Sequence, residues 1–142
     1  MRILLFLISL ILFSAAEAQR QGIKGQVFWL SGNQMPGPDK GKSPQQGIVR
    51  EIHIYNAANL SDATSQGGFY SEIKTSFVQK VTSNPDGSFL VKLPQGRYSL
   101  FVKEPQGLFA NTFDGQGCIN CISVRKKKYS WITIVVDYEA AY

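Results

Sequence analysis

The chain is poor in the side chains on which most enzymes and metal proteins rely. Its 142 residues include one histidine and two cysteines, and ten acidic residues stand against fifteen basic ones, for a net charge of +5. A zinc site takes about four ligands, and the two cysteines supply only two, with the histidine at best a third. Past residue 18 there is no helical periodicity and no apolar run of the roughly 20 residues that a membrane span needs. We therefore expect no metal, no cofactor and no membrane anchor in the mature chain.

The apolar run that does occur lies at the start of the chain. Arg2 precedes an apolar stretch at residues 3–13, and the tripeptide AEA at residues 16–18 has the small-x-small pattern that precedes signal-peptidase cleavage. The sequence therefore predicts a signal peptide over residues 1–18 and a single domain over residues 19–142. The mature protein is expected in the periplasm or outside the cell.

Short β-rich segments, separated by Gly, Pro, Asn and Asp, recur along the mature chain. Alternate residues of a strand share one face, and Phe89, Val91 and Leu93 form such an apolar row. Strands are predicted at residues 23–30, 48–55, 77–83, 88–93, 97–104, 122–124 and 131–138. The last two are expected to pair as a hairpin. Seven strands in about 120 residues indicate an all-β fold, a seven-stranded Greek-key β-sandwich.

Two turns in the middle of the chain have clear signals. In the NPDG sequence at residues 84–87, Asp86 can hydrogen-bond to nearby backbone and Gly87 accepts a positive φ. A second turn begins at Pro94 and ends at Gly96, where a positive φ is also expected. A β-branched side chain at Gly96 should therefore be costly.

The segment TSNPDGSFLVKLPQGRYSLFVKEPQG, residues 82–107, resembles the carboxypeptidase regulatory-like domain, a family of transthyretin-like, immunoglobulin-like β-sandwiches. The matching residues are Asp86, Gly87, Phe89, Leu93, Pro94, Gly96 and Tyr98. The sequence GIKGQV at residues 22–27 is similar to the family's opening strand. The resemblance implies this fold in a small exported bacterial protein. It implies no activity, because the motif consists of turn and core residues.

Two loops, at residues 31–47 and 56–71, are longer than the family pattern, and loops commonly carry specific function. Aromatic residues outside the alternating strands are candidate partner contacts, since aromatic side chains often anchor interfaces. These candidates are Phe69, Tyr70, Phe109 and Phe113. The alternative is that they close the ends of the sandwich. The expected partner is a protein or a carbohydrate.

The cysteines form a C-x-x-C pair, Cys118 and Cys121. Redox centres of this spacing usually lie at a helix N-terminus, which lowers the thiol pKa, whereas a strand is predicted after Cys121. In an extended chain the two residues would lie about 10 Å apart, beyond the roughly 7 Å limit for a disulfide. Gly115 and Gly117 allow a turn that brings them closer. We predict a disulfide, which suits an exported protein, with two free thiols as the alternative.

No residue set carries a catalytic signature. His53 alternates with Ile52 and Ile54 on a predicted strand and is expected to face solvent, and no nucleophile motif accompanies it. The basic run at residues 125–128 is interpreted as a solvated turn, so no nucleic-acid partner is expected. We therefore predict a non-catalytic binding or accessory module. The alternatives are a small exported hydrolase or thiol-redox protein, and a structural subunit whose strand edge pairs with a partner.

Overall fold

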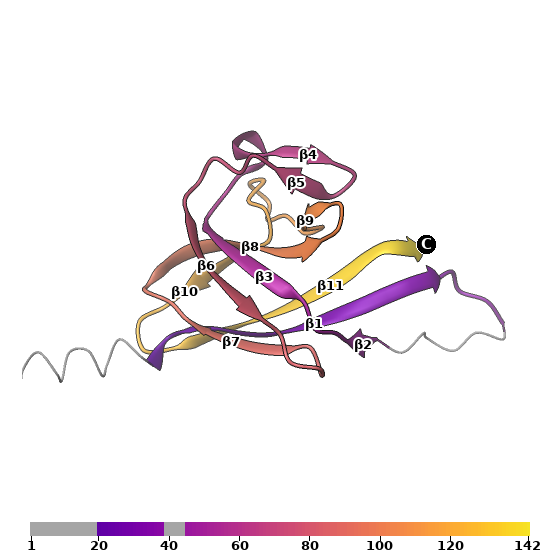
Figure 1. Cartoon of the computed structure of the whole chain (residues 1–142), viewed down its shortest axis with the longest axis horizontal. Helices are drawn as coiled ribbons and strands as arrows, with labels where there is room; N and C mark the ends of the chain where they lie inside the picture. The colour runs from indigo at the N-terminus through magenta and orange to yellow at the C-terminus, as the bar shows by residue number, and fades with distance from the viewer. Residues whose placement is uncertain (1–19, 39–44) are drawn as a thin grey trace, which may run out of the picture.

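The computed structural model describes residues 20–38 and 45–142, so the predicted signal peptide lies outside the described residues. These residues form an all-β protein with two sheets and no α-helix (Figure 1). A short 3-10 helix, η2, spans Leu60–Asp62. The strands are β1 (Gly22–Asn33), β2 (Gln46–Gly47), β3 (Glu51–Asn56), β4 (Thr64–Gln66), β5 (Phe69–Ser71), β6 (Phe77–Thr82), β7 (Ser88–Lys92), β8 (Gly96–Glu104), β9 (Gly107–Phe109), β10 (Cys121–Val124) and β11 (Tyr129–Ala141).

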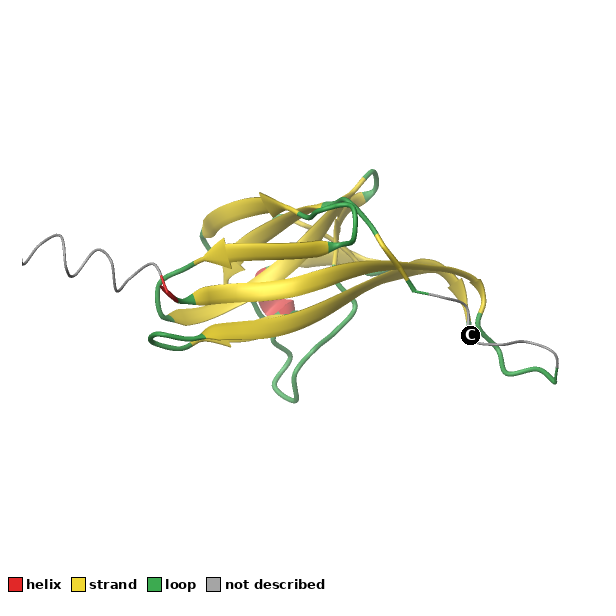
Figure 2. Ribbon diagram, turned by 90° about the horizontal axis from the view of Figure 1, so that it is seen from below, coloured by secondary structure: helices red, strands yellow, loops and turns green. Residues whose placement is uncertain are grey.

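The smaller sheet has four strands and is organised around β1. Along one edge β1 pairs in parallel with β11, and along the other it pairs with β7 and then with β2. A register shift between Trp29 and Ser31 interrupts the β1–β11 ladder. The far ends of β1 and β11 reach beyond the rest of the two sheets (Figure 2). β11 is an edge strand, since β1 is its one strand partner among the described residues.

The larger sheet has seven strands and is organised around β8. Its order is β4-β5-β9-β8-β3-β6, and β10 pairs with the first half of β8 on the same edge as β9. All these pairs are antiparallel. Strand β8 therefore has partners on both edges, β3 on one and β10 and β9 on the other, which makes it the centre of the sheet.

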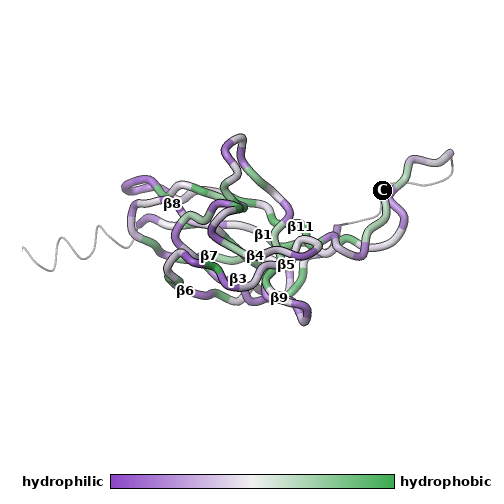
Figure 3. The backbone as a smooth tube through the Cα atoms, turned by 90° about the horizontal axis from the view of Figure 1, so that it is seen from above, coloured by the Kyte–Doolittle hydropathy of each residue, from purple (hydrophilic) through white to green (hydrophobic). Residues whose placement is uncertain are grey.

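The two sheets share one hydrophobic core. The four-stranded sheet contributes Ile23, Val27, Phe89, Val91, Ile134 and Val136, and the seven-stranded sheet contributes Ile52, Ile54, Tyr98, Leu100, Val102, Phe109 and Val124. In β3, β7 and β11 these residues alternate with exposed or half-buried neighbours, as expected for strands with one buried face. The central strand β8 differs, because its residues 98–102 are all buried. Hydrophobic residues gather in the strands, while the turns are mostly hydrophilic (Figure 3).

Each of the seven predicted strands has a counterpart in the structure. Four further strands, β2, β4, β5 and β9, are two or three residues long and were not predicted. The predicted hairpin between the last two strands is wrong, because β10 pairs with β8 whereas β11 pairs with β1. The turn between them carries the chain from one sheet to the other. Val124 and Ile134 consequently enter the core from opposite sides.

The two predicted turns are closed in different ways. Gly87 has a φ of 85°, and its carbonyl accepts a hydrogen bond from the amide of Val27 at 2.9 Å. Asp86 Oδ1 accepts hydrogen bonds from the backbone amide and the hydroxyl of Ser88, two residues further on. The expectation of a positive φ at Gly96 is wrong. That turn is instead closed by the hydroxyl of Tyr98, which donates to the carbonyl of Pro94 at 2.6 Å.

Candidate functional site

The outer face of the seven-stranded sheet carries a mixture of aromatic and charged side chains. Because Ile52 and Ile54 of β3 point into the core, the alternate residues Glu51, His53 and Tyr55 lie on the opposite face. Paired residues of the neighbouring strands lie on the same face. His53 lies opposite Phe101 of β8 and Lys80 of β6, and Tyr55 lies opposite Phe77 of β6.

Two loops, at residues 57–63 and 110–120, fold over part of this face and bury a second, smaller cluster of side chains. Its buried members are Tyr70, Phe101, Ala110 and Ile119. The loops are tied to each other, since the amide of Ile119 donates to the carbonyl of Ala58 and the amide of Leu60 donates to the carbonyl of Gly117. The predicted long loop at residues 56–71 therefore helps to build a wall of the candidate site.

The uncovered part of the face contains two neighbouring depressions, which we call the outer-face groove. One, of about 400 Å³, is lined on the β4–β5 side by Thr64, Ser65, Gln66, Phe69 and Ser71. The other, of about 470 Å³, is lined by His53, Tyr55, Lys103, Glu104, Pro105 and Leu108. Both depressions are also lined by Tyr70, Gln106 and Gly107. The shared residues show that the two depressions are adjacent.

A hydrogen-bonded pair of polar side chains, Glu51 and His53, lies at the β3 side of the groove. His53 Nε2 lies 2.6 Å from Glu51 Oε1, and Lys80 Nζ lies 3.6 Å from the same oxygen. The hydrogen bond to His53, assisted by the charge of Lys80, lowers the pKa of the Glu51 carboxyl. His53 also packs against the ring of Phe77, with centroids 5.7 Å apart. His53 is thus half-buried and ordered by its neighbours, whereas the sequence predicts a solvent-facing residue.

The four candidate aromatic contacts have different environments. Tyr70 and Phe109 are buried, and Phe69 is half-buried against Phe109. Phe69 and Tyr70 nevertheless line the groove, and burial raises the pKa of the Tyr70 hydroxyl. Phe113 lies in the loop before the cysteines with 50% of its surface exposed. The structure therefore brings two of the four residues together at one surface.

Cys118 and Cys121 are joined in a disulfide, with Cα atoms 5.7 Å apart. The predicted turn is made with positive φ angles at Gly117 and Asn120. Asp114 stabilises it, because its Oδ1 accepts hydrogen bonds from the amides of Gln116 and Cys118. Those backbone hydrogen bonds, assisted by a salt bridge to Arg97, lower the pKa of the Asp114 carboxyl.

A buried carboxylate that sequence reasoning missed lies at one end of the core. The side chain of Glu104 is 1% exposed, and its two oxygens accept hydrogen bonds from Arg50 Nε and from the hydroxyl of Tyr138, both at 2.7 Å. Burial, with the Glu104 hydrogen bond and charge, raises the pKa of Tyr138 to about 12. The guanidinium of Arg50 lies over the ring of Trp29, 5.7 Å from its centroid. The sequence could have indicated this burial, because Glu104 comes two residues after Val102 and therefore lies on the same, inward face of β8.

The described part of the chain contains no group of three or more His, Cys, Asp or Glu side chains arranged to hold a metal ion. None of its helical segments is long and apolar enough to cross a membrane. Comparisons with protein-family models, with curated proteins and with solved structures found no match for the chain. The resemblance of residues 82–107 to the carboxypeptidase regulatory-like domain therefore stays a prediction.

Proposed function

We propose that the protein is an exported, non-catalytic binding module that holds an oligosaccharide in the outer-face groove. The observation that carries the proposal is the pair of adjacent depressions that share Tyr70, Gln106 and Gly107. Ligand sites typically combine aromatic walls with a few polar groups that fix orientation. A sugar offers apolar C–H faces to aromatic rings and hydroxyl groups to side chains such as those of Lys103 and Gln106.

The proposal includes membership in the carboxypeptidase regulatory-like family, with a Greek-key sandwich as its fold. This is supported by the burial of residues that match the family pattern. Four of them are buried between or beside the sheets: Gly87, Phe89, Leu93 and Tyr98. Export of the protein is supported by the disulfide, because disulfides persist mainly in oxidising compartments.

The test is binding of the exported protein to an array of bacterial, fungal and plant oligosaccharides. We expect retention on at least one oligosaccharide class, and at least tenfold weaker retention when Lys103→Ala and Gln106→Ala are combined. Both residues are exposed, so the variant should fold normally. Gln95→Ala, in an exposed turn outside the groove, is the matched control. A protein partner captured equally by the wild type and the double variant, with no oligosaccharide retained, would contradict the proposal.

A hydrolase is the second candidate, and the Glu51–His53 pair favours it, because a carboxylate can orient an imidazole as a general base. His53 has no hydrogen bond to a hydroxyl or thiol among the described residues, so the pair lacks an evident nucleophile. A thiol-redox role has less support, since Cys118 is buried and a strand follows the pair. Hydrolysis of nitrophenyl esters or glycosides that His53→Ala abolishes would replace the binding role.

A further inference from the structure

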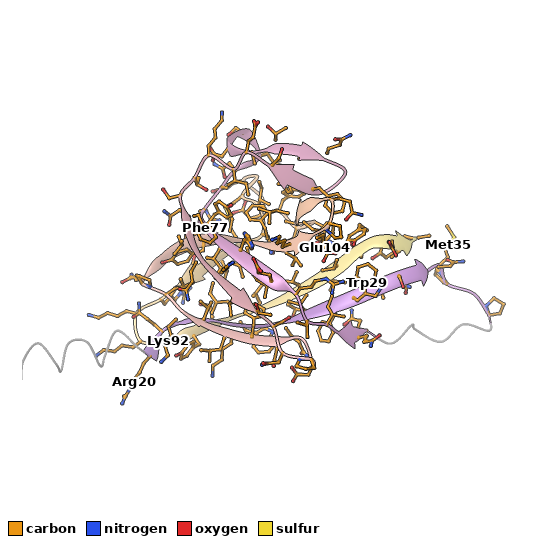
Figure 4. All side chains as sticks on the ribbon, viewed as in Figure 1. Arg20, Trp29, Met35, Phe77, Lys92 and Glu104 are labelled. Atoms are coloured by element: carbon orange, nitrogen blue, oxygen red, sulfur yellow. A yellow bond between two sulfur atoms is a disulfide. The ribbon has the colours of Figure 1, made fainter. Side chains whose placement is uncertain are left out.

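One end of the molecule gathers positive charge from three separate segments of the chain. We call it the basic end; its seven cations are Arg20, Lys24, Lys92, Arg125, Lys126, Lys127 and Lys128, all of them exposed. Strand register brings these segments together, because Gly22 of β1 lies opposite both Lys92 of β7 and Tyr129 of β11. Figure 4 shows Arg20 and Lys92 at this end. The sequence alone reveals a run of four cations, whereas the fold adds three more.

Negative charge is lacking in the segments that build the basic end. Residues 20–26, 88–92 and 121–133 contain no aspartate or glutamate. Of the seven cations, Arg20, Lys24, Lys92, Arg125, Lys126 and Lys128 form no ion pair with any carboxylate that the structure describes. The positive potential of this surface is therefore not offset by local pairing, and it favours an anionic partner.

Two large apolar side chains stand among these cations on the outer face of the four-stranded sheet. Lys24 has Trp131 as its cross-strand neighbour on β11 and Leu90 as its neighbour on β7. Trp131 is 63% exposed and Leu90 is 46% exposed. The next residues along these strands, including Ile23 and Val91, point into the core, so the Trp131–Lys24–Leu90 row faces outward. An apolar row next to unopposed cations is the composition of surfaces that lie on lipid bilayers.

We infer that the basic end docks reversibly on the surface of an anionic phospholipid bilayer. Lysine and arginine are attracted by the negative surface potential of such a bilayer. Tryptophan is favoured at the level of the lipid head groups, where Trp131 would be placed by the cations around it. A soluble polyanion such as a nucleic acid would engage the cations but give Leu90 and Trp131 no apolar environment, so a bilayer fits the surface better. The outer-face groove is on the other sheet, so this inference does not depend on the proposed function.

The first experiment compares binding of the exported protein to two kinds of vesicle. One kind is pure phosphatidylcholine, and the other contains about 30 mol% phosphatidylglycerol. We expect binding to the anionic vesicles alone, and weaker binding as salt is added. The chain has two tryptophans, of which Trp29 packs against Tyr138, so a blue shift in fluorescence on binding should come from Trp131. The variant Trp131→Phe should lose that shift.

Matched charge variants then locate the binding surface. Arg125→Gln, Lys126→Gln and Lys128→Gln together should weaken vesicle binding roughly 100-fold, since each cation contributes about a fivefold factor. The control combines Lys74→Gln, Lys80→Gln and Lys103→Gln, which remove the same charge from exposed positions outside the basic end, and it should change binding by less than about threefold. Melting curves check that both variants fold.

Three outcomes would overturn the inference. Equal loss of binding in the two triple variants would mean that net charge alone is responsible. Equal binding to neutral and anionic vesicles would show that the cations are not involved. Tight binding to duplex DNA, without binding to vesicles, would identify the basic end as a polyanion site instead.

Discussion

Removal of the Glu104 carboxylate should be among the most destabilising single substitutions in this protein. Glu104→Ala leaves the guanidinium of Arg50 and the hydroxyl of Tyr138 without their acceptor at the end of the core. Breaking a buried ion pair costs about 3–5 kcal/mol. The Arg50 side chain is 33% exposed and can recover hydration, so we expect the lower end, about 3 kcal/mol. For a domain of this size that corresponds to a fall in Tm of roughly 10 °C.

Thermal and urea unfolding, followed by circular dichroism, measure this effect. Glu104→Gln keeps the size of the side chain and an acceptor oxygen, so it should cost less, about 1–2 kcal/mol. Glu139→Ala removes an exposed carboxylate from β11 and should change the free energy of unfolding by less than about 0.5 kcal/mol. A Glu104→Ala variant that melts within about 2 °C of the wild type would contradict this expectation. The Arg50–Glu104–Tyr138 group would then contribute nothing net to stability.

The remaining predictions concern the turns, the pH dependence and the disulfide. In thermal melts, Gly87→Val should destabilise the protein much more than Gly96→Val. Gly87 has a φ of 85°, and a Cβ atom there would collide with the carbonyl of Val27. Equal Tm values for the two variants would contradict this. The pKa of Tyr138 is raised to about 12 from an ordinary value near 10, so its stabilising effect is complete below about pH 10 and is lost as pH rises toward 12. Tyr138→Phe should flatten that part of the stability curve, and an unchanged slope would argue against it. Non-reducing mass spectrometry should find Cys118 and Cys121 oxidised, and two alkylatable thiols would refute the pairing. The closed loop is short and is worth at most roughly 2 kcal/mol, so the double serine variant should still fold, with a Tm lower by no more than about 7 °C.

The strands that alternate most clearly were predictable from the sequence. Phe89, Val91 and Leu93 form an inward row in the structure, as their spacing indicates, and Gly87 adopts the positive φ that its turn demands. Local patterns succeed here because each strand or turn is determined by a few adjacent side chains. Gly96 shows the limit, since the hydroxyl of Tyr98 closes that turn without a left-handed residue.

Features that join distant parts of the chain could not be predicted in the same way. The parallel pairing of β1 with β11 joins residues more than 100 positions apart, and a strand's own pattern does not name its partner. The outer-face groove likewise depends on β5 lying beside β9, a contact made by two strands too short to recognise in the sequence. The basic end emerges only once Lys24 and Lys92 are brought to the turn at residues 125–128.

The most direct test of the binding role is an amide NMR titration with the oligosaccharide retained on the array. Chemical shift changes should cluster at Tyr70, Gln106 and Gly107, where the two depressions meet. Amides of the four-stranded sheet, on the far side of the core, should stay unchanged. Shifts confined to the basic end, or no shifts at saturating oligosaccharide, would contradict a ligand site in the outer-face groove.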